Sequence, residues 1–157
     1  MRIMIATLFA AIAVLGTAVV YGTDVFCAAV QRPALARVDG RSLLAVMGNI
    51  HRYGDRRMPV PGVLGLAAAA VSAAFAALAG RWGQAGAAAA AVALLLVWLL
   101  VYLRVSAPIN RQLTAGVDQP GLPIDAQALQ RNWDKVIAIR ASLQGLAVAA
   151  LCLALVI

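Results

Sequence analysis

Side chains that could bind a metal or carry out acid–base chemistry are scarce in this chain of 157 residues. It has one histidine, His51, two cysteines, Cys27 and Cys152, and six acidic residues. One histidine cannot supply both axial ligands of a bis-histidine haem within one chain, and a zinc site with three or four protein ligands also lacks material. The glycines near Gly62 and Gly83 have no accompanying Lys, Ser or Thr, which excludes a phosphate-binding loop of the usual kind.

Charged residues are also few, at 12% of the chain, about half of the ~25% usual in soluble domains. Hydrophobic residues make up 64%, and the mean hydropathy is +0.90. A water-soluble bundle needs polar helix faces, which most of the apolar runs lack. The net charge of +7 does not indicate a nucleic-acid partner, because no binding motif accompanies it and aromatic residues are scarce. We expect an all-α integral membrane protein, with residues 1–157 forming a single domain.

Four apolar segments approach the ~20 residues needed to span a bilayer. They cover about residues 3–25, 62–79, 85–104 and 138–157, and they predict a four-helix bundle with up-down-up-down topology. The first is longer than the apolar core of a typical signal peptide, so we interpret it as a retained span. The last helix should begin near Ala126, with Asp125 as its N-cap. A tight turn at residues 80–84 should join spans two and three.

The basic residues are distributed unequally around these spans. Only Arg2 and Arg81 lie on one side, whereas eleven lie in the two long connections or beside them. Because basic loops stay in the cytoplasm, we expect both termini outside and both long connections inside, in the cytoplasmic (inner) membrane. The eleven are Arg32, Arg37, Arg41, Arg52, Arg56, Arg57, Arg104, Arg111, Arg131, Lys135 and Arg140.

Spans two and three are rich in Ala and Gly, which allow membrane helices to approach closely. A homodimer through these small-residue faces is one arrangement they permit, and membrane lipid is an expected partner. The predicted topology places Cys27 and Cys152 at opposite ends of the membrane, which argues against a disulfide between them.

His51 lies in the first long connection, where the sequence predicts an amphipathic helix at the membrane surface. Asp39 or Ser42 can cap this helix, and Leu44, Met47 and His51 then share one face. Histidine is the side chain best suited to proton transfer near neutral pH. The alternative is an imidazole that simply lies among the lipid headgroups. Gly54 and the prolines at 59 and 61 should turn the chain into span two.

Asp24 ends the first span, and a carboxylate at the membrane boundary is costly unless it is paired. Two partners are candidates. Arg140 would form a structural ion pair, whereas a hydrogen bond to His51 would fix the imidazole tautomer and raise its basicity.

Trp133 and Arg140 fall on one stripe of the fourth helix. Pro108 should stop the third helix and bring Asn110 to the same membrane face. These side chains can wall a pocket for a flat aromatic ligand, with the guanidinium stabilising a developing phenolate or enolate. They can also be interfacial anchors. Trp98 and Tyr102 are expected to face lipid or to fill the bundle.

This combination of features resembles the anthrone oxygenase-like membrane proteins over nearly the whole chain. The resemblance rests on the four spans, the His-Arg segment before span two, the residues Pro108-Ile109-Asn110-Arg111, and Trp133 followed by Arg140. Fungal members oxidise anthrones to anthraquinones with dioxygen and no metal, and most bacterial members have no known function. The resemblance implies that His51 is the base and that Asn110, Trp133 and Arg140 line the pocket.

The leading hypothesis is an oxidase or monooxygenase acting on a lipophilic phenolic, anthrone-like or quinol-like substrate. His51, Arg140 and Asp24 would be catalytic, with Asp24 orienting His51, and Asn110, Trp133 and Tyr21 would bind the substrate. One alternative is a redox or gas-binding protein in which His51 ligates haem b, with a Met such as Met47 or Met58 opposite or a partner across a dimer axis. Another is a non-catalytic membrane subunit whose arginines bind anionic lipid or a partner protein.

Overall fold

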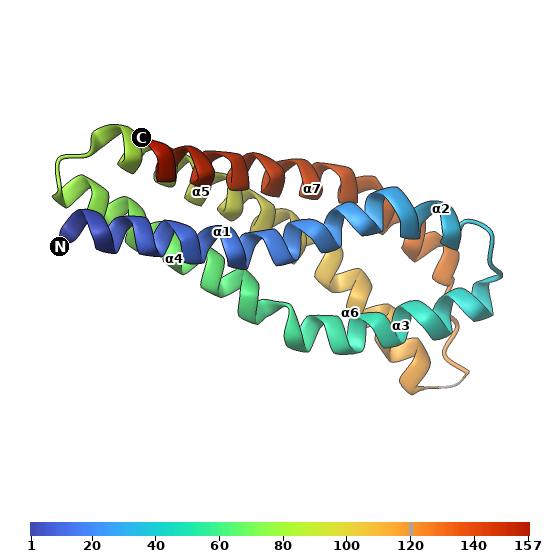
Figure 1. Cartoon of the computed structure of the whole chain (residues 1–157). Coiled ribbons are helices and arrows are strands. Elements are labelled where there is room, and N and C mark those ends of the chain that lie inside the picture. Colours follow the sequence, from blue (N-terminus) through green and yellow to red (C-terminus); the bar gives the residue numbers. More distant parts are fainter. Residues whose placement is uncertain (120) are drawn as a thin grey trace.

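Four long helical segments run up, down, up and down, so both chain termini lie at the same end (Figure 1). The computed structural model describes residues 1–119 and 121–157, and every regular element within them is helical. The first segment comprises α1 (Arg2–Phe26), the π-helix η1 (Cys27–Gln31) and α2 (Arg32–Leu35), and the second comprises α3 (Gly40–Arg57) and α4 (Pro59–Leu78). The third comprises α5 (Trp82–Val101), the π-helix η2 (Tyr102–Ser106) and α6 (Ala107–Asp118), and the fourth is α7 (Ala126–Val156). The predicted all-α four-helix bundle is therefore confirmed.

Each segment is long and apolar enough, by length and composition, to cross a membrane. The segments cover residues 2–35, 40–78, 82–118 and 126–156, and each includes one of the four predicted spans to within one residue. Only 17% to 33% of the most apolar stretch of each segment is buried inside the protein. Most of the apolar surface therefore faces outward, an arrangement that suits lipid better than water.

The helices continue through positions where the sequence predicted breaks. The expectation that Pro108 stops the third helix is wrong, because the chain passes from α5 through η2 into α6. In η2 the Ala107 amide bonds to the Tyr102 carbonyl, and Pro108 then lies in the first turn of α6, where no amide donor is required. The turn predicted at Gly54 is also absent, since α3 continues to Arg57 and meets α4 at Met58.

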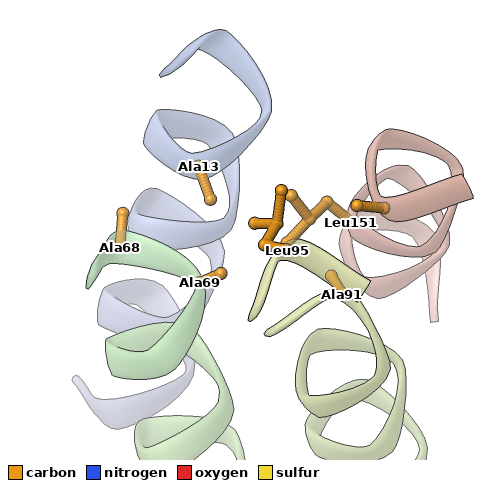
Figure 2. Close-up of a cluster of buried hydrophobic side chains, with 7 residues drawn as sticks. Ala13, Ala68, Ala69, Ala91, Leu95 and Leu151 are labelled. Atoms are coloured by element: carbon orange, nitrogen blue, oxygen red, sulfur yellow. The ribbon is translucent and has the colours of Figure 1, made fainter. Parts of the chain in front are cut away.

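In the half of the bundle that contains the termini, small residues set the spacing of the helices. A Cβ added at Gly16 of α1 would lie 2.8 Å from the Gly65 nitrogen and the Pro61 oxygen of α4, so the two backbones are in direct contact. Leu95 and Leu151 fill the space between α5 and α7, facing the alanines of α1 and α4 (Figure 2). We call this group the first cluster; it comprises Ala13, Ala68, Ala69, Ala91, Leu95, Ala147 and Leu151.

The other half is built on α3, α6 and α7. Gly48 of α3 packs directly against α6, where a Cβ would meet the Leu113 oxygen at 2.6 Å. The helix expected in the first long connection is present as α3, and its buried face packs against α6. We call the buried side chains here the second cluster: Leu43, Met47, Ile109, Leu113, Ala126, Trp133 and Ile137.

The predicted N-caps at Asp39 and Asp125 are confirmed. Asp39 accepts hydrogen bonds from the Arg41 and Ser42 amides and from the Ser42 hydroxyl, and Asp125 accepts one from the Ala128 amide at 2.8 Å. The Ser42 hydroxyl and these amides lower the pKa of Asp39. The cap therefore stabilises α3 above the carboxyl's unfolded pKa, and this contribution is lost as the pH falls through the lower folded value.

The close contact of α1 with α4 can be tested by replacing Gly16 with alanine. The added methyl group would force the two backbones apart, and overpacking of this kind costs about 1–3 kcal/mol. Gly22 is the matched control on the same helix, because a Cβ there meets nothing within 4 Å. Thermal unfolding in detergent, followed by circular dichroism, should show a lower Tm for Gly16→Ala and no loss for Gly22→Ala. Equal Tm values for the two variants would contradict the packing.

Candidate functional site

A cavity of about 210 Å³ lies where the first and second clusters meet. Leu95 lines it from the first cluster, and Met47 and Trp133 line it from the second. Most of its wall is apolar. Its polar and aromatic wall includes Asp24, His51, Asp55, Trp98, Tyr102, Asn110, Trp133, Arg140 and Gln144, which come from α1, α3, α5, η2, α6 and α7.

Asp24 of α1 and Arg140 of α7 form a buried ion pair at one side of this cavity. Arg140 Nη2 lies 2.8 Å from Asp24 Oδ1, and the two residues are 5% and 2% exposed. Gln144 Nε2 and Trp98 Nε1 both donate to Asp24 Oδ2, at 2.8 Å and 3.1 Å. Arg140 Nη1 donates to the Ser106 hydroxyl at 2.8 Å. Of the two partners considered for Asp24, the structure pairs it with Arg140.

The guanidinium of Arg140 is also surrounded by aromatic rings. Its Cζ lies 5.7 Å from the ring centroid of Trp98, 5.5 Å from that of Tyr102 and 5.4 Å from that of Trp133. Cation–π attraction of this kind is strongest where the cation is shielded from water. Arg140 Nε nevertheless has no hydrogen-bond partner among the described residues, so one buried donor remains available beside the cavity.

A second network joins α3, η2, α6 and α7 through Asp55. Its Oδ1 accepts hydrogen bonds from the Tyr102 hydroxyl at 3.0 Å and from Asn110 Nδ2 at 2.9 Å. Asn110 Oδ1 in turn accepts from Trp133 Nε1 at 3.1 Å. Sequence reasoning missed Asp55, although its position four residues after His51 places both side chains on one helix face.

His51 is 6% exposed, and its Nε2 atom has no hydrogen-bond partner among the described residues. Its ring centroid lies 5.9 Å from that of Trp133, with the ring planes tilted by 50°. A buried polar atom without a partner is rare in proteins, and a catalytic role is one recognised reason for it. The structure forms no hydrogen bond between His51 and Asp24, so the expected orientation of the imidazole by Asp24 is not observed.

The cavity brings together most of the residues singled out in the sequence. Asp24, His51, Asn110, Trp133 and Arg140 all line it. Three other aromatic residues were also considered in the sequence. Tyr21 does not line the cavity but lies against α7, where its ring approaches Gly145. Trp98 and Tyr102, which were expected to face lipid or fill the bundle, form part of the cavity wall and stack at 5.9 Å.

The residues present do not suit a haem held by His51 and an opposing methionine. Met47 and Met58 both line the cavity, but they come from the same helical stretch as His51, four residues before it and seven after it. Neither thioether is therefore placed to bind the haem iron from the face opposite to His51. The cavity is also smaller than the ~300–1,000 Å³ usual for cofactor pockets. Within the described residues, no group of three or more His, Cys, Asp or Glu side chains could hold a metal ion.

Fold and site together define a helical bundle of membrane type with a mostly apolar cavity and two buried polar networks. Comparison of the chain with protein-family models, with curated proteins and with solved structures finds no match in any of the three. The functional argument therefore depends on the site itself.

Loss of one partner of the Asp24–Arg140 pair should destabilise the protein strongly. Asp24→Asn leaves a buried guanidinium uncompensated, which costs about 3–5 kcal/mol. The matched control is Asp118→Asn, which breaks the ion pair with Arg52 at the surface and should cost no more than ~1 kcal/mol. Thermal unfolding in detergent measures both effects. A similar small loss for the two variants would show that the buried pair contributes little.

Proposed function

We propose that this chain is a membrane-embedded oxidase or monooxygenase that acts on a lipophilic phenolic, anthrone-like or quinol-like substrate. The observation that carries the proposal is that His51, whose buried Nε2 atom has no hydrogen-bond partner among the described residues, lines a mostly apolar cavity. A base must have a free lone pair within reach of the proton that it removes. The aromatic rings of Trp98, Tyr102 and Trp133 suit a flat aromatic ligand, and Arg140 supplies a positive charge beside them.

The proposed reaction begins when an activated C–H or phenolic O–H of the substrate gives its proton to His51 Nε2. The unpartnered Nε–H of Arg140 donates to the oxygen on which negative charge develops. For an anthrone-like methylene group, the carbanion transfers two electrons to dioxygen as a C–O bond forms, and protonation gives a hydroperoxide. Loss of water then leaves a ketone, so one dioxygen yields one carbonyl group and one water.

The roles of two predicted residues change in this scheme. Asp24 holds Arg140 in place and does not orient His51, since its carboxylate oxygens are bound to Arg140, Gln144 and Trp98. Asn110 is bound to Asp55 and Trp133, which makes it a positioning residue for the cavity wall.

The size of the cavity favours a small substrate. A cavity of about 150 Å³ in another protein holds one benzene molecule, and the cavity here measures about 210 Å³. This volume suits a head group of one or two rings better than a three-ring anthrone. Lipophilic substrates would arrive through the membrane, because exposed apolar residues such as Val63 and Ile50 line the cavity.

We further propose that the protein lies in the cytoplasmic membrane with both termini outside. Arg140 is buried in the bundle, and removing it from the eleven basic residues of the long connections leaves ten. Arg2 and Arg81, at the terminal end, bind backbone carbonyls of Leu78 and Ile157. The imbalance of basic residues therefore still favours cytoplasmic long connections.

Replacement of His51 by glutamine tests the proposed base. General-base catalysis contributes about 10²–10⁴-fold to a rate, so dioxygen uptake with anthrone or with a one-ring quinol should fall at least 100-fold. Val46→Ala is the control, because Val46 is exposed on the same helix. Purified protein in nanodiscs and an oxygen electrode suffice for the measurement. Turnover by His51→Gln at the wild-type rate would remove His51 from the mechanism.

The visible spectrum of the purified protein separates this proposal from its alternatives. An oxidase without haem should show no Soret band, whereas a Soret band that is lost in His51→Gln would favour haem ligation. A non-catalytic subunit would consume no dioxygen with any of these substrates, and neutralising Arg52, Arg56 and Arg57 together would abolish its association with anionic lipid or a partner.

A further inference from the structure

A second hollow lies between α3 and α6 and differs in character from the cavity. It measures about 340 Å³ and is lined by His51, Arg52, Asp55, Arg56, Arg111, Thr114, Ala115, Asp118 and Gln119. All of these residues except Ala115 are polar, and several are exposed, including Arg56, Arg111 and Gln119. We call this hollow the polar cleft. Its lining suits water, whereas the wall of the cavity is mostly apolar.

Two residues, His51 and Asp55, border both the cavity and the polar cleft. They lie four residues apart on α3, so their side chains are neighbours on one helix face. On the cavity side, Asp55 is held by the Tyr102 hydroxyl and by Asn110. These two titratable side chains therefore stand between an apolar chamber and a polar cleft.

We propose that His51 and Asp55 form a proton path between the cavity and water in the polar cleft. An imidazole can accept a proton at one ring nitrogen and release a proton from the other. Asp55 gives a neighbouring carboxylate that can pass a proton on. This path rests on the proposed function for the origin of the proton. The proton that the substrate gives up leaves the cavity by this path. The proton that completes the product water enters the cavity by the same path. The net proton count of the reaction is zero.

The cations on both sides of the path disfavour a lasting positive charge on His51. Like charges repel, and Arg52, Arg56 and Arg111 line the cleft while Arg140 lies on the cavity side. Together they disfavour a positive charge on the imidazole, so a proton that His51 accepts is passed on and not retained. Besides His51, the charged and titratable groups that line the two spaces are Asp24 and Cys27 of α1 and η1, Arg52, Asp55 and Arg56 of α3, Tyr102 of η2, Arg111 and Asp118 of α6, and Arg140 of α7.

The path can be tested without any substrate, because His51 is the only histidine in the chain. In protein labelled with ¹⁵N-histidine, the two ring nitrogens of His51 give the only imidazole signals, and their rate of proton exchange with water can be measured by NMR in nanodiscs. Ala115→Trp fills the polar cleft, since Ala115 lines the cleft and not the cavity. Val63→Trp is the matched variant on the cavity side.

We expect Ala115→Trp to slow the exchange at least tenfold and Val63→Trp to change it less than twofold. Unchanged exchange in Ala115→Trp, or slowing in Val63→Trp alone, would overturn the proposal. If Ala115→Trp does not fold, as judged by circular dichroism, Thr114→Phe fills the same cleft and takes its place. Absence of dioxygen uptake by the wild-type protein would contradict the proposed function and leave the exchange result standing. Fast exchange in a variant whose polar cleft is filled would contradict the proton path and leave the proposed function standing.

Discussion

The buried ion pair between Asp24 and Arg140 is the interaction on which the site depends. It joins α1 to α7 inside a bundle whose other interior contacts are mainly alanine and leucine. Removing two charges from water costs several kcal/mol per ion unless each is paired and hydrogen-bonded. Ser106, Gln144 and Trp98 supply those hydrogen bonds from η2, α7 and α5. The pair therefore fixes the relative positions of four helical elements at the level of the cavity.

Two different kinds of packing create the space beside this pair. Near the termini, glycine contacts hold α1 and α4 together. At the other end, α3 packs with α6, and the π-helices η1 and η2 precede Pro33 and Pro108. A π-helix shifts the helical register and is often found at functional sites. The cavity lies between these two packed regions and takes its polar side chains from both networks.

Much of the fold could be predicted from sequence, because apolar length and helix caps are local signals. The spans and the caps at Asp39 and Asp125 all follow from such signals. The expectation that Pro108 ends the third helix was wrong, because the turn before it widens into the π-helix η2 and the helix continues. Whether a turn can widen in this way is not visible in the local sequence. In the site, His51 and Arg140 were conspicuous because buried reactive groups are rare in an apolar chain. Asp55 and Tyr102 were missed, since their hydrogen bond joins elements 47 residues apart and no local pattern reveals it.

The sequence separation of Asp24 and Arg140 has a consequence for the synthesis of the protein. The two residues are 116 positions apart, and α1, which carries Asp24, is synthesised before α7, which carries Arg140. At about 5–20 residues per second, the chain needs roughly 6–23 s to extend from one to the other. For that time Asp24 lacks the Arg140 guanidinium with which it pairs in the folded protein. The buried contacts of Asp24 can therefore form only after α7 has been synthesised, so α1 reaches its final packing late.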